Sequence, residues 1–129
     1  MKRDSLVFLE EMLEAAKAVS GYVQGLTQEA FLDDARTVDA VCMRLLTLGE
    51  SAGALLRVFP EFESRFPDVP WRAMSGLRNH IAHDYFGLDQ AMVWETAIRD
   101  IPVLAARLEQ LLKQLSSSAS FPLTPETSG

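Results

Sequence analysis

The stretch VDAVCMRLLTLGESAGALL, residues 38–56, decides the fold class, because its apolar residues recur every three or four positions. This period places them along one side of an α-helix. The apolar stripe consists of Val38, Val41, Leu45, Leu48, Ala52, Leu55 and Leu56. Most residues of the section 49–54 are small, and small side chains let a second helix approach closely. The sequence therefore predicts a long helix over about 34–58 that packs against a neighbour.

Two helices are predicted before this segment. Residues 4–25 repeat apolar side chains at helical spacing, with Asp4 suited to cap the first turn and Gly25 to end the helix. Thr27 can cap a short helix that ends near Leu32.

Prolines break the pattern after the long helix, so residues 59–69 are predicted to form a loop. Three aromatic side chains are expected to pin this loop to the body of the protein: Phe59, Phe62 and Phe66. Pro70 suits the first turn of the next helix, which is predicted to run to about Tyr85 and to end before Gly87.

A last helix is predicted to begin at Asp89 and to kink at Pro102. Its apolar positions are Val93, Trp94, Ala97, Ile98, Ile101, Leu104, Leu108, Leu111 and Leu112. No segment alternates with period two, which argues against strands. We therefore expect an all-α bundle of four main helices plus a short helix in residues 1–115, followed by a disordered, serine- and proline-rich tail over 116–129.

Composition and size indicate a single globular domain: the chain has 129 residues, and 48% of them are apolar. It lacks the uncharged apolar run of about 18 residues that a membrane span needs. Acidic residues such as Glu10 and Glu14 interrupt what would be the apolar core of a signal peptide. The expected location is cytoplasmic, without a membrane partner.

The single cysteine, Cys42, rules out an internal disulfide and is too few for a zinc site. Its apolar neighbours suggest a core position. The two histidines are three residues apart and match no metal-ligand spacing. No metal and no cofactor are expected.

The net charge of −6 argues against general coating of nucleic acid, because non-specific affinity depends on neutralising phosphates. The charge is unevenly distributed, and residues 35–83 carry six basic and five acidic groups. A local arginine patch on an acidic body is therefore expected.

Residues 78–85, RNHIAHDY, place a guanidinium, an imidazole and a phenol within about two helical turns. A guanidinium binds phosphate oxygens in a fixed fork, and a histidine can exchange a proton near neutral pH. On a straight helix, however, Arg78 and His83 lie about 140° apart around the axis, so one copy makes a poor clamp. This geometry favours a homodimer in which two such helices line one cleft.

The neighbours of these residues have open roles. The motif could cleave or grip a nucleic-acid backbone, and Asn79 is then expected to orient the scissile phosphate or His83, or to be an ordinary polar helix residue. His80, four residues before Asp84, suits an ion pair or an auxiliary RNA contact. Asp84 adds a negative charge that would favour a protonated His83 if it lies close. Glu50 is expected to pair with a nearby arginine.

The motif resembles the signature of the HepT-like branch of the HEPN superfamily, which joins an arginine and a histidine a few residues apart to a tyrosine two residues later. Arg78, His83 and Tyr85 fill those places. The similarity also covers residues 39–41, 49–52 and 94–96 and Leu104. The resemblance implies a dimeric, metal-independent endoribonuclease. His83 would act as general base or acid, and Arg78 would stabilise the charge on the phosphoryl oxygens, giving a 2′,3′-cyclic phosphate.

The resemblance also implies a toxin of a type VII-like toxin–antitoxin pair. In that family a partner nucleotidyltransferase, the MntA-like antitoxin, attaches AMP to the matching tyrosine, here Tyr85. Taken without the family, Tyr85 would be an aromatic residue that covers the core at a helix end. Two other functions stay open: a non-catalytic helical binding subunit of a nucleotidyltransferase complex, with Arg78 and His83 as phosphate contacts, and a purely structural dimerisation domain.

Overall fold

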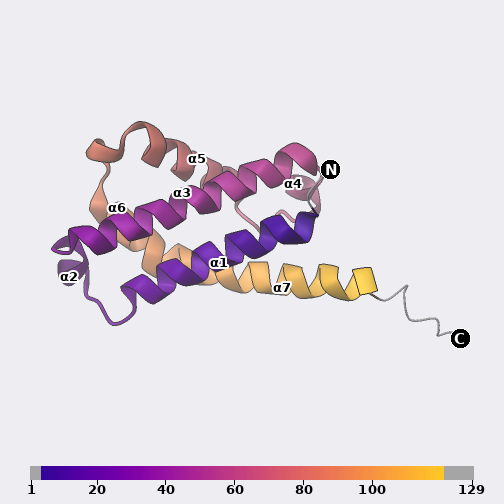
Figure 1. Cartoon of the computed structure of the whole chain (residues 1–129), viewed down its shortest axis with the longest axis horizontal. Helices are drawn as coiled ribbons and strands as arrows, with labels where there is room; N and C mark the ends of the chain where they lie inside the picture. The colour runs from indigo at the N-terminus through magenta and orange to yellow at the C-terminus, as the bar shows by residue number, and fades with distance from the viewer. Residues whose placement is uncertain (1–3, 121–129) are drawn as a thin grey trace, which may run out of the picture.

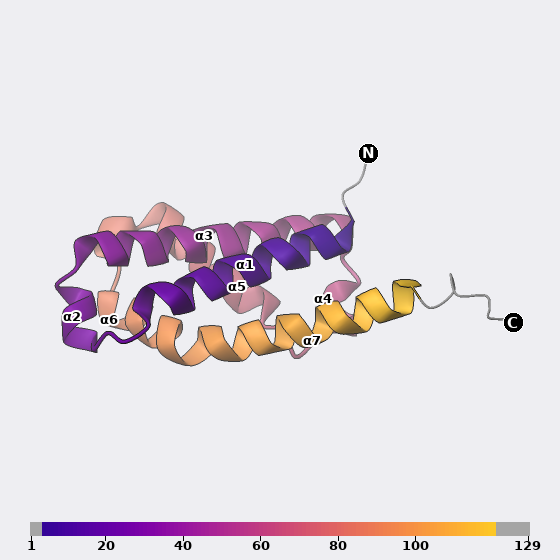
Figure 2. The ribbon, with the colours of Figure 1, turned by 60° about the horizontal axis from the view of Figure 1, so that its bottom comes forward.

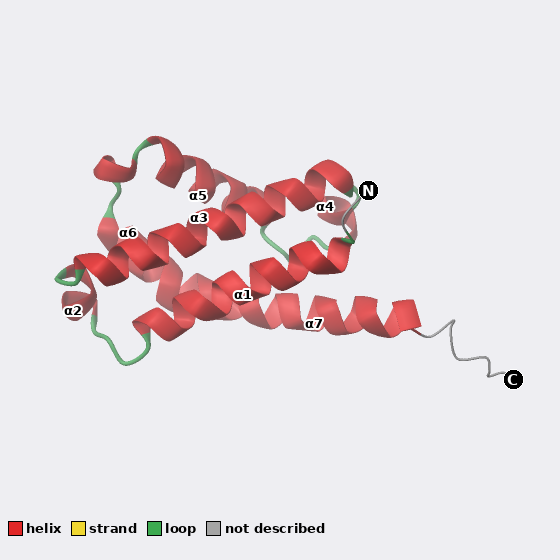
Figure 3. Ribbon diagram, viewed as in Figure 1, coloured by secondary structure: helices red, strands yellow, loops and turns green. Residues whose placement is uncertain are grey.

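The computed structural model describes residues 4–120, and within this range every regular element is a helix or a helical turn (Figure 3). The predicted all-α class is therefore confirmed. The elements in chain order are α1 (Ser5–Val23), α2 (Gln28–Leu32), α3 (Ala35–Val58), α4 (Phe62–Arg65), α5 (Trp71–His83), the 3-10 turn η1 (Tyr85–Gly87), α6 (Gln90–Glu95), the π-helical turn η2 (Thr96–Asp100) and α7 (Ile101–Ser120).

Helix α3 lies in the middle of the bundle, between α1 and α5 (Figure 1). Helix α1 contacts α3 on one side and α7 on the other. The helices therefore follow one another across the molecule in the order α5, α3, α1, α7. The turned view shows the same sequence of α3, α1 and α7, with the short α2 packed beside the start of α3 (Figure 2).

Helix starts follow the predicted caps. Asp4 accepts a hydrogen bond from the Leu6 amide at 3.0 Å, and Thr27 accepts one from the Ala30 amide at 3.1 Å. Asp34 caps α3 and Asp89 caps α6 in the same way. These side chains satisfy amide groups that have no partner inside the helix, which is why short polar residues fix these boundaries.

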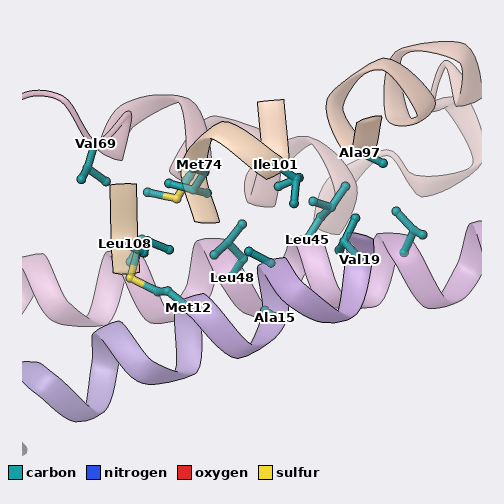
Figure 4. Packing of buried hydrophobic residues seen from close by; sticks show 14 of the residues in the cluster. Met12, Ala15, Val19, Leu45, Leu48, Val69, Met74, Ala97, Ile101 and Leu108 are labelled. Carbon is teal, nitrogen blue, oxygen red and sulfur yellow. The ribbon is translucent and has the colours of Figure 1, made fainter. Parts of the chain in front are cut away.

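The core runs between α1, α3 and α7, where Met12, Leu48 and Leu108 meet (Figure 4). Each is at most 2% exposed. Burying a side chain of this size stabilises the fold by about 1.5–3 kcal/mol relative to leaving it in water. The predicted stripe of the long helix is confirmed except at Leu56, which is only partly buried; the six other positions are buried, namely Val38, Val41, Leu45, Leu48, Ala52 and Leu55.

The predicted loop over 59–69 is wrong in part, because it contains the single-turn helix α4. Burial of Phe62 explains the turn. Its ring lies 5.0 Å from that of Phe66 and edge-on to Trp71 at 6.3 Å, measured between centroids. The expectation that the phenylalanines pin this segment is confirmed, and their packing makes one turn of helix favourable among the prolines.

Helix α5 ends at His83, two residues earlier than predicted, and Tyr85 lies in η1. Asp84 leaves the helical conformation with φ −146°, and its carboxylate folds over Gly87. A Cβ at Gly87 would come within 2.6 Å of Asp84 Oδ2, so a larger residue there would require the carboxylate to turn away.

The predicted kink at Pro102 takes the form of η2, the turn before it, in which the Ile101 amide donates to the Thr96 carbonyl. Proline has no amide hydrogen, and its ring crowds the carbonyl four residues earlier, so a wider turn relieves the strain. The extra residue shifts the helical phase, and Ile98, predicted for the core, is 42% exposed.

Helix α7 continues to Ser120, so the first five residues of the segment predicted as a tail, 116–120, are helical. The remainder of that predicted tail lies outside the described residues. Of the helices in residues 4–120, none combines the length and the apolar character needed to cross a bilayer.

Gly49 sets how closely α3 and α5 approach each other. It is buried, and a Cβ there would clash with the Cβ of Arg78 and lie 2.7 Å from the Met74 carbonyl oxygen. The predicted close approach at the small residues of α3 is therefore confirmed.

Gly49→Ala should destabilise the fold by about 1–3 kcal/mol, since the new methyl group meets backbone of α5 that can move only with the whole helix. Gly76→Ala is the matched control on α5. Its Cβ would meet nothing within 4 Å, so it should stabilise by roughly 0.5–1 kcal/mol through helix propensity. Urea unfolding measures both changes. An unchanged midpoint for Gly49→Ala would contradict the packing argument.

Candidate active site

The arginine and the histidine of the motif both lie on α5, but in different surroundings. The Cβ of Arg78 packs against Gly49 of α3, and the arginine side chain is 31% exposed. His83 is the last residue of α5 and is exposed. Within residues 4–120 the two side chains share no hydrogen bond or ion pair, as their separation around the helix predicts.

The guanidinium of Arg78 is held by two neighbours. Its Nε donates to Glu50 Oε2 at 2.7 Å, and its Nη2 donates to the same oxygen in an ion pair. Its Nη1 donates to Asn79 Oδ1 at 3.1 Å. The prediction that Glu50 pairs with a nearby arginine is confirmed. Asn79 therefore accepts a hydrogen bond from Arg78 and helps to restrain the guanidinium.

Asp84 forms no ion pair with either histidine of the described chain. Because α5 ends at His83, the four-residue spacing from His80 to Asp84 no longer puts the two side chains on one helical face. Asp84 instead approaches Gly87, and no ion pair joins it to His80 or His83 in the described chain. The ion pair expected for His80 is therefore wrong.

The Tyr85 hydroxyl donates a hydrogen bond to Asp39 Oδ1 on α3. That bond raises the pKa of the phenol to about 12, with burial as the next cause, because both favour the protonated form. The ring is 36% exposed, and it lies edge-on to Phe86 at 5.8 Å between centroids. Tyr85 is thus anchored to α3 while one side of it faces solvent.

No role is assigned to Asp39 from the sequence alone, although its spacing from Glu50 indicates that both face α5. Asp39 and Glu50 are eleven residues apart, about three helical turns, so both lie on the face of α3 that meets α5. Asp39 holds Tyr85 and Glu50 holds Arg78. Two carboxylates of one helix therefore fix both ends of the motif.

A shallow, mainly apolar cavity of about 370 Å³ opens beside Tyr85. It is lined by Asp39, Cys42, Met43, Leu46, Ile81 and Tyr85. Met43 and Phe86 are strongly exposed at this face. Cys42 is buried, as predicted, and desolvation with the nearby charge of Asp39 raises the pKa of its thiol to about 11, which disfavours a nucleophilic role.

A larger groove of about 610 Å³ lies between α5, η2 and α7, and it does not include Arg78, His83 or Tyr85. Its two arginines are engaged: Arg99 pairs with Glu95 at 3.0 Å, and Arg107 donates to the Asp68 carbonyl at 2.6 Å. Across residues 4–120 no three His, Cys, Asp or Glu side chains are grouped so as to hold a metal ion.

Comparison with known proteins identifies the family of this chain. The family model described as "Ribonuclease HepT-like" matches residues 12–111. A Thermococcus cleftensis protein named "Probable ribonuclease HepT" is 34% identical over 113 residues, covering 88% of this chain and 100% of that protein. A Methanocaldococcus jannaschii protein named "Putative RNase MJ0127" is 31% identical over 114 residues, covering 88% of this chain and 92% of that protein. No solved structure matched this chain.

The family match covers most of the bundle, from Met12 in α1 to Leu111 in α7, and includes all three residues of the Arg–His–Tyr motif. The chain belongs to the HepT-like ribonuclease family.

Proposed function

We propose that this protein is a metal-independent endoribonuclease that cleaves RNA with Arg78 and His83. One observation carries the proposal: in a chain of a ribonuclease family, a restrained guanidinium and an exposed imidazole occupy the last two turns of one helix. The two groups supply the functions that transfer within RNA requires, namely charge stabilisation at phosphorus and proton transfer.

In the proposed reaction the ribose 2′-oxygen attacks the adjacent phosphorus, and the bond from phosphorus to the 5′-oxygen breaks. His83 accepts the 2′-hydroxyl proton as general base, and an imidazolium of His83, from the same or the second copy, donates a proton to the leaving 5′-oxygen. Arg78 stabilises the negative charge that builds up on the non-bridging oxygens. The products are a 2′,3′-cyclic phosphate and a 5′-hydroxyl end, and no metal-bound water takes part.

A homodimer completes the proposed site. His83 lies off the face of α5 that carries Arg78, so a second copy is needed to bring a histidine opposite an arginine. Met43, Tyr85 and Phe86 support this arrangement, because they form an exposed apolar patch next to His83. A two-fold axis near the patch would cover it and bring two motif helices together.

We further propose that Tyr85 is the site at which a nucleotidyltransferase partner silences the enzyme, in a type VII-like toxin–antitoxin pair in the cytoplasm. The tyrosine oxygen would attack the α-phosphorus of ATP, and pyrophosphate would leave. Asp39, which already accepts the hydrogen bond of the hydroxyl, takes its proton. The added AMP places bulk and negative charge beside a site that receives a phosphate backbone.

The alternative function is that of a non-catalytic helical subunit of a nucleotidyltransferase complex. The net charge of −6 and the engagement of Arg78 by Glu50 favour it, since both weaken attraction to RNA. The two functions differ in cells. A ribonuclease toxin arrests growth when it is expressed without its partner, whereas a binding subunit is harmless.

Arg78→Ala and His83→Ala should each reduce cleavage of single-stranded RNA by roughly 10²-fold or more, in buffer that contains EDTA. Arg72→Ala is the matched control, because Arg72 lies on the same helix and pairs with Glu63 away from the motif. Cleavage of a labelled RNA, with mass analysis of the cyclic phosphate, measures the effect. Activity that needs magnesium and survives His83→Ala would refute the proposed mechanism.

Co-expression with the cognate nucleotidyltransferase should add AMP-sized mass increments to a peptide that contains Tyr85. Tyr85→Phe should abolish them, since it removes the accepting oxygen. Tyr22→Phe is the control, because Tyr22 is the other tyrosine and at 39% is about as exposed. Intact-protein and peptide mass spectrometry give the result. Increments that persist on Tyr85→Phe would contradict the proposed site.

Phe86→Asp should weaken the homodimer about tenfold or more, because it places an unpaired charge in the apolar patch. Val7→Asp is the control, since Val7 is exposed on α1, which lies on the side of α3 away from α5. Light scattering behind size-exclusion chromatography measures the association. A Phe86→Asp protein that dimerises as the wild type does would show that this face is not the interface.

A further inference from the structure

The Glu50 carboxylate places a negative charge in the proposed RNA-binding site, where it would repel phosphate. It contacts the guanidinium that the proposed mechanism assigns to phosphate, and at 46% exposure it is open to solvent. An exposed ion pair adds little to folding stability, so stability alone does not account for the carboxylate at this position. Its nearness to the scissile phosphate should also weaken RNA binding through repulsion of like charges.

The hydrogen bonds of Arg78 suggest what Glu50 does. A guanidinium carries five N–H groups in one plane. Nε uses its single N–H on Glu50, Nη2 uses one on the same oxygen, and Nη1 uses one on Asn79. Of the five, two therefore have no partner among the described residues, one on each Nη atom.

Two unused N–H groups on one guanidinium can serve a phosphate. Arginine recognises phosphate through two parallel hydrogen bonds to two oxygens, which specify direction as well as charge. With Nε tied to α3, the guanidinium plane cannot rotate freely, and its unused donors keep one direction. A free arginine would have to lose side-chain rotamer freedom on each encounter with substrate.

We propose that Glu50 is a positioning residue that orients the guanidinium of Arg78, so that its two unused N–H groups bind the non-bridging oxygens of the scissile phosphate. The inference rests on the proposed ribonuclease function and assigns to α3 a part in the reaction. Glu50 acts through Arg78 and does not itself touch the substrate.

Opposite effects on binding and turnover follow from this role. Removing the carboxylate in Glu50→Ala relieves repulsion, so KM should stay the same or fall, while loss of orientation should lower kcat roughly 10- to 100-fold. Glu50→Gln keeps an oxygen that accepts from Nε and Nη2 and loses only the charge. It should restore kcat to within a few-fold of wild type with KM at or below the wild-type value.

Steady-state cleavage of a short labelled RNA by wild type, Glu50→Ala and Glu50→Gln measures the separate effects on kcat and KM. Circular dichroism and urea unfolding check that each variant is folded. The proposal is overturned if Glu50→Ala keeps the wild-type kcat. It is also overturned if Glu50→Gln is as slow as Glu50→Ala, because the charge and not the orientation would then matter.

A second measurement does not depend on cleavage. In a protein with ¹⁵N-labelled arginine, the Nε–H signal of Arg78, assigned with Arg78→Ala, should exchange slowly with water. Glu50→Ala should speed this exchange at least tenfold, and Glu50→Gln should not. If the exchange rate of the Arg78 Nε–H is unchanged in Glu50→Ala, the inference is overturned while the ribonuclease proposal stays intact. A signal that responds in a protein that cleaves no RNA refutes the ribonuclease proposal but supports the tie between Glu50 and Arg78.

Discussion

The close approach of α5 to α3 at Gly49 is the constraint on which the rest of the site depends. With a hydrogen in place of a side chain, Gly49 lets the Cβ of Arg78 and the Met74 carbonyl lie against the α3 backbone. At this separation Glu50, the next residue of α3, reaches the guanidinium of Arg78. A wider spacing would leave the arginine to solvent, and the site would lose the direction of its main cation.

Helix α3 thus joins the core to the site. One side carries Leu45, Leu48 and Leu55 into the bundle, and another presents Asp39 and Glu50 to α5 and η1. Because the two carboxylates are about three turns apart on a buried helix, they fix two points of the motif at a set distance. The acidity of the chain therefore has a local use at this helix, because its carboxylates hold Tyr85 and Arg78.

The features of the fold and site that could be predicted from the sequence are those set by residues close together along the chain. The caps at Asp4, Thr27 and Asp89 and the stripe of α3 follow from neighbours along the chain, so the sequence predicted them correctly. The pairing of Glu50 with an arginine followed from a charge among small residues. The role of Asp39 depends on a contact across the bundle, and the end of α5 at His83 coincides with the turn formed by Asp84 and Gly87. Local propensity does not register contacts between residues 46 positions apart, such as Asp39 and Tyr85.

The attachment of Tyr85 also bears on how a modification there would act. Its hydroxyl is the link between η1 and α3, and η1 begins two residues after His83. A group on the tyrosine oxygen removes the donated hydrogen, so the bond to Asp39 is lost whatever the size of the group. In the proposed silencing, the modification would have two effects: it would add negative charge near the motif and release the turn beside the imidazole. The second effect would need no contact with RNA, because it would arise from loss of the link between η1 and α3.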